Sequence, residues 1–282
     1  MLIDGESMRD VTPAGRDVAF VFEQYSLYPL MTVFDNLAFP LRSPLRRVPE
    51  GRIRDRVETT AEKLRITQLL DRTTANLSGG EMQRVSLGRA LVRNPQIYLM
   101  DEPLSNLDAK LRASVRKDIK KLQIDLGITV VYVTHDQTEA MSMADMVVLM
   151  KDGHIQQTGT PEELYYKPAN TFVAEFVGAP PMALIEGSAL PGFGEAARIG
   201  LRAENVEVAE AGTGRMTCKV SECEFLGSET FIGLSHPGAS GLTVSLPGLR
   251  NIAAGEEMEI SFSDNDLHFF DSAGQRLAQQ AG

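Results

Sequence analysis

Short apolar runs alternate with helical periods up to about residue 175. The runs are nearly continuous and rich in β-branched and aromatic residues, as expected of strands covered on both faces. They are Val18–Phe22, Ile97–Met100, Thr129–Val133 and Met146–Met150. Helical stretches lie between them, including residues 52–71 and residues 107–126, where apolar residues recur every three or four positions. This alternation predicts an α/β domain with a mostly parallel sheet.

The pattern changes after Gly178-Ala-Pro-Pro181, where two prolines interrupt regular structure. Beyond it, short strand candidates are separated by Gly, Pro, Asn and Asp. These candidates are Met216–Cys223, Thr230–Leu234, Leu242–Leu246 and Glu257–Phe262. We therefore predict an α/β domain at residues 1–176, a linker at 177–187 and a small all-β barrel or sandwich at 188–282.

Composition excludes few classes of function. The net charge of -10 disfavours nucleic acid or anionic lipid as a direct partner. No run of 18 apolar residues is present, so the sequence predicts no membrane-spanning helix.

Two adjacent carboxylates, Asp101 and Glu102, end the apolar run that begins at Ile97. Ligands of parallel sheets sit at the carboxyl ends of the strands. There, one carboxylate can hold magnesium through water and the other can orient or deprotonate an attacking water. Taken alone, the same residues also fit a strand that leads into a turn.

Leu77-Ser-Gly-Gly80 directly precedes a helical run from Glu81 to Arg93. Glycines allow close approach of the backbone to an anion, and a helix start offers unsatisfied N–H donors. A plain helix N-cap is the alternative reading of these four residues.

The order of the motifs decides between these readings. Leu77–Leu91, Leu99–Pro103, Ser105–Asp108 and Val133–Asp136 follow one another with the order and spacing of the ATP-binding cassette family, which this chain resembles. The resemblance implies a mostly parallel α/β P-loop NTPase domain. It also implies a helical subdomain at about residues 25–95, whose start, Tyr28–Asn36, touches a membrane subunit.

The resemblance also assigns roles to single residues. Ser78, Gly79, Gly80 and Glu81 form the signature that closes over the γ-phosphate bound by the opposite subunit. Asp101 supports Mg²⁺ through water, Glu102 is the catalytic carboxylate, and Asp108 ends the loop that communicates between the two sites. His135 is the switch histidine that contacts the γ-phosphate. ATP and Mg²⁺ are thus the expected cofactors.

Further segments resemble importers of the carbohydrate-uptake type, similar to the maltose and glycerol-3-phosphate ATPase subunits. They are Arg16–Phe22, Phe176–Met182, Gly200–Glu204 and Leu226–Phe231. This resemblance implies an OB-like barrel of the TOBE type at the C-terminus, with dimerising and regulatory roles. It implies a second ATP-binding subunit, two membrane permease subunits and, indirectly, an extracytoplasmic solute-binding protein, with no nucleic acid. The location would be peripheral, on the cytoplasmic face of the membrane, and the solute a sugar, a polyol or glycerol-3-phosphate.

Three departures from the family stand out. The 282 residues contain no Gly-x-x-x-x-Gly-Lys-Ser/Thr (Walker A) loop to hold phosphates, and no Gly-Lys dipeptide. Glu23 stands where the family has glutamine, with Gln24 one place later. Glu81 replaces glutamine in the signature, and we expect this replacement to leave function unaffected.

The missing loop leaves three hypotheses open. The chain could be a transport ATPase whose recorded sequence starts at an internal methionine. It could instead lend only its signature to the nucleotide of an intact partner, or it could be a non-catalytic remnant acting through its barrel. In each case we expect that the 282 residues do not hydrolyse ATP alone.

Overall fold

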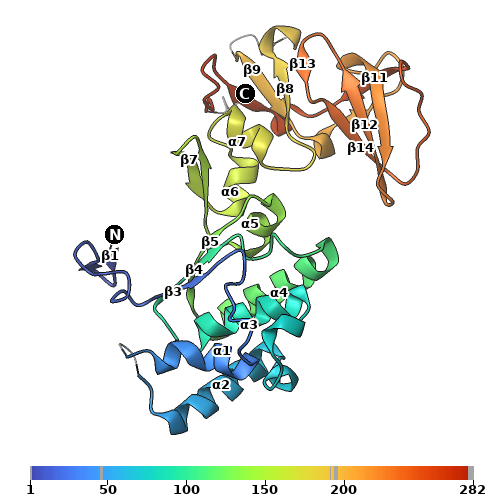
Figure 1. Cartoon of the computed structure of the whole chain (residues 1–282). Helices are drawn as coiled ribbons and strands as arrows, with labels where there is room; N and C mark the ends of the chain where they lie inside the picture. Colours follow the sequence, from blue (N-terminus) through green and yellow to red (C-terminus); the bar gives the residue numbers. More distant parts are fainter. Residues whose placement is uncertain (1, 45–46, 191, 194–195, 279–282) are drawn as a thin grey trace. The chain divides into compact units, whose positions relative to one another are not determined.

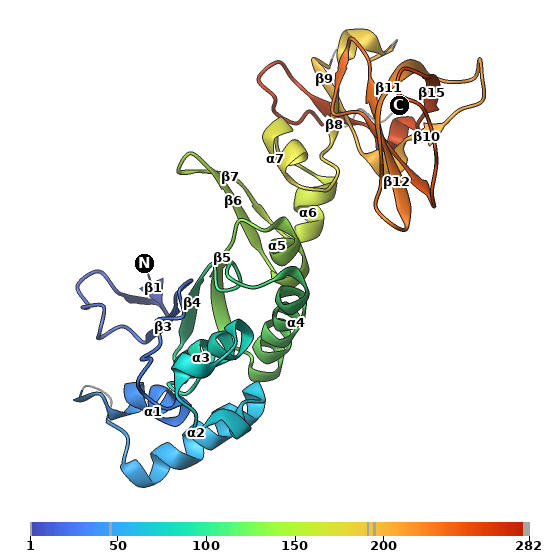
Figure 2. The same cartoon turned by 45° about the vertical axis from the view of Figure 1, so that its right-hand side comes forward.

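The computed structural model describes residues 2–44, 47–190, 192–193 and 196–278. Its contacts divide the chain into two compact units, residues 1–139 and 140–282 (Figures 1 and 2). Each unit has its own hydrophobic core, so each is described by itself.

A three-stranded parallel sheet is the centre of the first unit. Its strands are β3 (Val18–Val21), β4 (Ile97–Asp101) and β5 (Thr129–Val133), in the order β3-β4-β5. The register pairs Val18 with Ile97 and Ile97 with Thr129. The predicted parallel α/β arrangement is therefore confirmed for these three runs. A short antiparallel pair, β1 (Leu2–Ile3) and β2 (Glu6–Ser7), precedes the sheet.

Helices complete the first unit. They are α1 (Val33–Ala38), α2 (Glu50–Leu64), α3 (Gly79–Leu91) and α4 (Ala109–Leu126), with a 3-10 turn, η1 (Phe39–Arg42), after α1. Helix α3 packs against β3, and α1 and α2 pack against α3. Ala19, Val21, Tyr98 and Met100 of the strands join the helix side chains in one buried core. The helix predicted for residues 52–71 ends earlier than expected, because Arg65 adopts a left-handed conformation (φ 57°) that caps α2.

The opposite face of the sheet is exposed. Phe20 and Phe22 are 45% and 49% exposed, and Val131 and Val133 are 51% and 52% exposed. The expectation that these strands are covered on both faces is therefore wrong for the described residues. The sequence pattern misleads here because both faces of each strand carry apolar side chains.

The second unit contains an antiparallel hairpin, β6 (Val147–Lys151) and β7 (His154–Gly159). The run Met146–Met150 was expected to join the parallel sheet, yet among the described strands β6 pairs only with β7. Val148 and Met150 are more than half exposed. Helices α6 (Pro161–Tyr166) and α7 (Thr171–Phe176) follow the hairpin, and α5 (Gln137–Met143) precedes it.

A nearly closed antiparallel barrel completes the second unit, which confirms the prediction of a small all-β, OB-like domain. One of its sheets, ordered β13-β8-β9-β16, comprises β8 (Ala183–Glu186), β9 (Arg198–Leu201), β13 (Ala239–Ser240) and β16 (His268–Phe270). The other, ordered β10-β15-β11-β12-β14, comprises β10 (Glu207–Val208), β11 (Met216–Phe225), β12 (Glu229–Ser235), β14 (Thr243–Pro247) and β15 (Glu257–Ser261). All four predicted strands are present, within two residues at each end.

The unit boundary at residue 139 lies before the predicted domain boundary near residue 177. Strand β8, inside the predicted linker at 177–187, pairs with β9 as part of the barrel. Part of that linker is thus strand, because Ala183, Leu184 and Ile185 are buried there.

Candidate functional site

The candidate site lies where the three parallel strands end. Glu23 follows β3 by two residues, Asp101 is the last residue of β4, and His135 follows β5 by two residues. Because β3, β4 and β5 are parallel and in register, these residues share one edge of the sheet. Sequence order alone leaves them more than 30 positions apart, whereas the topology groups them.

Glu102 is the central side chain of this edge. Its backbone adopts a left-handed conformation (φ 42°), and its N–H donates to the carbonyl of Val133 at 3.0 Å. A non-glycine residue held in this region is strained, and such strain clusters at functional sites. The carboxylate oxygen Oε2 lies 3.0 Å from Nδ1 of His135. An ionised carboxylate only accepts hydrogen bonds, so Nδ1 carries the proton in this contact.

Both groups of this pair are open to solvent. The Glu102 side chain is 34% exposed and that of His135 is 74% exposed. They are therefore oriented by one another while remaining accessible to a ligand.

Asp101 is exposed at the end of β4, opposite Val133 of β5. The described residues contain no group of three or more His, Cys, Asp or Glu side chains able to hold a metal ion by themselves. One free carboxylate fits Mg²⁺, which keeps several waters and takes other ligands from substrate phosphates.

Glu23 is tied to the segment that follows Glu102. The Ser105 hydroxyl donates to Glu23 Oε1 at 3.2 Å, and Asn106 Nδ2 donates to the Glu23 carbonyl at 3.1 Å. Gln24 is exposed, and its side chain has no recorded hydrogen bond within the described ranges. Of the two neighbouring predicted positions, Glu23 is the one engaged with the edge.

A buried carboxylate supports the loop that carries His135. Glu139 is only 3% exposed and accepts hydrogen bonds from Tyr132 Oη at 2.9 Å and Thr134 Oγ1 at 2.8 Å. Burial, followed by the charge of Glu139, raises the pKa of the Tyr132 phenol. The phenol therefore stays protonated as a donor. Sequence analysis missed Glu139; the Asp-x-x-Glu pattern at the start of α5 was the available signal.

Asp136 and Arg112 connect this loop to the start of α4. Arg112 donates to Asp136 Oδ2 at 3.4 Å and to the Leu107 carbonyl at 3.0 Å. Burial acts to raise the pKa of Asp136, but hydrogen bonds from Glu139, Thr138 and Arg112 outweigh it and lower the pKa. Asp108, predicted as the end of the communicating loop, caps α4 by accepting from the Leu111 N–H at 3.0 Å. Arg112 had no signal in the linear sequence.

The signature residues lie at the start of α3. The Glu81 carboxylate accepts from the Ser78 N–H at 2.8 Å and from the Ser78 hydroxyl at 2.7 Å. These hydrogen bonds lower the pKa of Glu81. The Glu81 side chain thus closes the helix cap, and the expectation that its replacement of glutamine leaves function unaffected stays a prediction. The N-cap reading of Ser78 is thus present in the structure, and it is compatible with a ligand contact.

The two glycines of the signature differ in their surroundings. A Cβ at Gly80 would lie 2.8 Å from Leu111, so glycine is needed for α3 to approach α4. A Cβ at Gly79 would make only ordinary contacts, the nearest being Leu107 at 3.5 Å. No hydrogen bond recorded for the described part of the chain joins the signature to Asp101, Glu102 or His135.

The described helices include none that is long and apolar enough to cross a membrane.

Comparison with known proteins adds a family assignment to this geometry. Residues 1–105 match the family described as ABC transporter, and residues 199–270 match the TOBE domain. The sn-glycerol-3-phosphate import ATP-binding protein UgpC 3 of Agrobacterium fabrum is 42% identical over 295 residues, covering 98% of this chain and 83% of that protein. The trehalose/maltose import ATP-binding protein MalK of Thermococcus litoralis is 43% identical over 302 residues, covering 96% and 80%.

A solved structure is also similar. CbiO1 from Clostridium perfringens, part of the ABC transporter complex CbiONQ, aligns with a TM-score of 0.53 and 28% sequence identity, over 59% of this chain and 67% of that chain. The motif order, the fold and these matches agree: the chain belongs to the ATP-binding cassette (ABC) transporter family.

Proposed function

We propose that this chain is the ATP-hydrolysing subunit of an importer for a sugar, a polyol or glycerol-3-phosphate. The observation that carries the proposal is the contact between Glu102 and His135 beside Asp101, at the carboxyl edge of the sheet. The similarity to sn-glycerol-3-phosphate and trehalose/maltose import proteins supports the importer class and the solute range.

Each residue of the edge has a distinct task in this proposal. Glu102 orients the attacking water and accepts its proton, while His135, held by Glu102 through Nδ1, presents Nε2 to the γ-phosphate. Asp101 holds Mg²⁺ through water, and the ion, when bound, neutralises the charge of the phosphates. Glu23 lies beside this position, and its hydrogen bond from Ser105 keeps it at the edge.

The signature acts on a second nucleotide. Ser78 is exposed and Gly79 is half-buried at the start of α3. The backbone N–H groups and the helix dipole at this end of the helix favour phosphate. A second ATP-binding subunit, which holds this nucleotide, therefore completes the ATPase. The loop that anchors the phosphates at the Asp101 edge is not among the 282 residues printed, so turnover requires one from outside them.

The membrane partner is proposed to dock on the segment between β3 and α1. Leu30 is 92% exposed, and the neighbouring aromatic pair Tyr28 and Phe39 is about 40% exposed. Buried Asn36 holds the segment rigid by accepting from the Tyr28 N–H at 2.9 Å and donating to the carbonyls of Tyr28 and Thr32 at 3.0 Å. A fixed loop with an exposed leucine suits the interior of a protein contact. Docking there would place the chain peripherally on the cytoplasmic face of the membrane.

Two variants test assembly and nucleotide sharing separately. Leu30→Asp should prevent recovery of the permease subunits with this chain, whereas Leu249→Asp, at a leucine 70% exposed in the barrel, should not.

Ser78→Arg should abolish ATP hydrolysis by the assembled transporter while leaving assembly intact. Ser114→Arg, at an exposed position on α4, should leave hydrolysis unchanged. An assembled transporter that hydrolyses ATP equally well with Ser78→Arg would overturn the shared-site proposal.

The second candidate, a subunit that lends only its signature, predicts a different pattern. It is favoured by the absence of any Gly-Lys dipeptide in the 282 residues. In that case Ser78→Arg abolishes hydrolysis, and Glu102→Gln leaves it unchanged because the edge at Asp101 holds no working nucleotide.

A further inference from the structure

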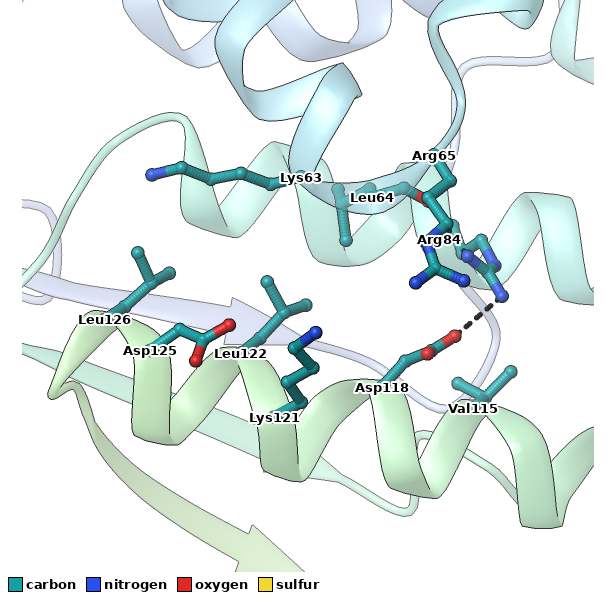
Figure 3. A pocket seen from close by; sticks show the side chains of 10 residues that line it. All are labelled: Lys63, Leu64, Arg65, Arg84, Val115, Asp118, Lys121, Leu122, Asp125 and Leu126. Carbon is teal, nitrogen blue, oxygen red and sulfur yellow. Dashed lines mark hydrogen bonds and ion pairs between the residues drawn. The ribbon is translucent and has the colours of Figure 1, made fainter.

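A pocket in the first unit lies away from the candidate nucleotide site, between the C-terminal end of α2, the first turns of α3 and the C-terminal half of α4 (Figure 3). Its volume is about 320 Å³. That is at the lower end of the roughly 300–1,000 Å³ typical of small-molecule sites. Its size therefore suits a small molecule.

Apolar side chains form the floor of the pocket. Leu64 and Val115 are 3% and 1% exposed and belong to the core of the first unit. Figure 3 shows Leu122 and Leu126 pointing from α4 toward the end of α2, where Leu64 points back at them. A polar ion alone would leave this floor without a partner, so the pocket favours a ligand with an apolar body.

The charges around this floor are mostly positive. Of the six charged residues that line the pocket, four are cations and two are acids, in a chain whose net charge is -10. Arg84 is paired with Asp118 at 2.7 Å. Lys63, Arg65 and Lys121 have no ion pair recorded within the described ranges, and Asp125 is the remaining acid. The pocket therefore attracts an anion.

The walls of the pocket are held in place before any ligand arrives. Arg84 donates from Nη1 to the carbonyl of Leu64 at 2.9 Å and from Nη2 to Asp118, joining α3 to both α2 and α4. Arg65 caps α2 in its left-handed conformation. Preorganised walls reduce the ordering cost of binding.

We propose that this pocket binds a small amphipathic anion, an alkyl or aryl carboxylate or phosphate whose apolar body lies on Leu64, Leu122 and Leu126. Lys121, whose ammonium group lies beside Leu122 in Figure 3, would contact the anionic group. Because α3 begins at the signature and α4 begins after Asp108, such a ligand is placed to act as an effector of the ATPase. That last consequence rests on the proposed function, whereas binding itself does not.

Isothermal titration calorimetry on the full chain, without nucleotide, tests the proposal. Four probes separate the contributions: hexanoate and hexyl phosphate carry both features, hexanol lacks the charge, and inorganic phosphate lacks the apolar body. We expect saturable binding of at least one of the first two, at least about tenfold tighter than hexanol or inorganic phosphate. Which anion binds more tightly identifies the preferred group. Equal binding of hexanol, or of inorganic phosphate, would overturn the proposal.

Variants locate the binding in the pocket. Lys121→Glu should weaken binding by at least about tenfold, and Leu126→Ser by about threefold or more. Lys117→Glu is the matched control, since Lys117 is exposed on the same helix and does not line the pocket; it should change affinity less than about twofold. Circular dichroism checks that each variant is folded. Absence of binding by both anions, or binding that both pocket variants leave unchanged, contradicts the proposal.

Discussion

The parallel sheet of the first unit and the barrel of the second are covered differently. The barrel surrounds its core, in which Ile199, Leu201, Ile232, Val244 and Ile260 are fully buried. The parallel sheet buries one face under helices and exposes Phe20, Phe22, Val131 and Val133 on the other. The candidate catalytic residues lie at the edge of this half-covered sheet, where polar contacts position them. Apolar burial therefore stabilises the barrel, whereas the site depends on a network of hydrogen bonds around Glu102 and Glu139.

Matched truncations of phenylalanine should show the largest contrast. Phe270 of β16 is fully buried, so Phe270→Ala should lower the free energy of unfolding by about 3–5 kcal/mol. Phe20 of β3 is 45% exposed, and Phe20→Ala should cost less than about 1 kcal/mol. Chemical denaturation of both variants measures the difference. Similar losses would show that the outer face of the sheet is covered in solution.

A histidine should make the barrel sensitive to acid. Burial, followed by the positive charges of Arg276 and Arg202, lowers the pKa of His268 to about 4 from 6.5. The unfolded chain therefore takes up a proton that the folded barrel does not. Stability should be highest above about pH 6.5 and should fall by up to about 1.4 kcal/mol per pH unit as the pH drops toward 4.

Denaturation of the wild type and of His268→Gln at several pH values measures this effect. The variant should lose most of the dependence in the barrel. An unchanged pH profile would mean that other groups dominate the acid response.

Removing the buried carboxylate at the site should loosen the edge of the sheet. Glu139→Ala leaves the hydroxyls of Tyr132 and Thr134 without their acceptor, a loss of about 1–3 kcal/mol. Hydrogen exchange should become faster in β5 and in the loop that carries His135, with little change in the barrel. Glu62→Ala, at an exposed position on α2, is the control. Equal hydrogen-exchange protection of β5 and of this loop in Glu139→Ala and Glu62→Ala would show that Glu139 does not position His135.

The cap of α3 should have the smallest effect. Glu81→Ala removes the acceptor of two hydrogen bonds from Ser78 and should cost about 1 kcal/mol. Because these bonds lower the pKa of Glu81, their contribution is present above pH 4.5 and is lost as the pH falls through the lowered value. Hydrogen exchange in the first turn of α3 at pH 7 and at acid pH measures it. No difference between wild type and Glu81→Ala at pH 7 would show that the cap does not stabilise the helix.

Features carried by continuous stretches were predictable from the sequence. Strands β4 and β5, the stripe on α4 and the four long barrel strands follow from periodicity. The candidate site residues were predicted from motifs whose order is fixed, and their roles stay predictions. Which face of a strand is covered was not predictable, because Phe20 and Val131 have the same apolar character as the less exposed residues beside them. The pairing of Val147–Lys151 with β7 is a local hairpin through Asp152 and Gly153, which both have positive φ. The Asp-Gly pair was the available signal for it, and the apolar run alone does not contain that signal.

Parts of the site also escaped prediction for a physical reason. Arg112 and Glu139 act through contacts that cross between α4, β5 and α5. Arg112 stands in no recognisable motif, and Glu139 has only the short Asp-x-x-Glu pattern at the start of α5 as a signal. The role of Glu81 was missed because its partner, Ser78, had been interpreted only as a ligand contact or as a simple N-cap.

Phosphate release by the assembled transporter, with a phosphate-binding loop supplied to this chain from outside the 282 residues, tests the central claim most directly. If Glu102 is the general base, Glu102→Gln should lower the rate by about 100-fold or more while assembly is unchanged. Glu62→Gln, which removes a charge on exposed α2, should hydrolyse ATP at the wild-type rate. Equal rates for Glu102→Gln and Glu62→Gln would contradict the assignment of the Asp101, Glu102 and His135 edge as a catalytic site.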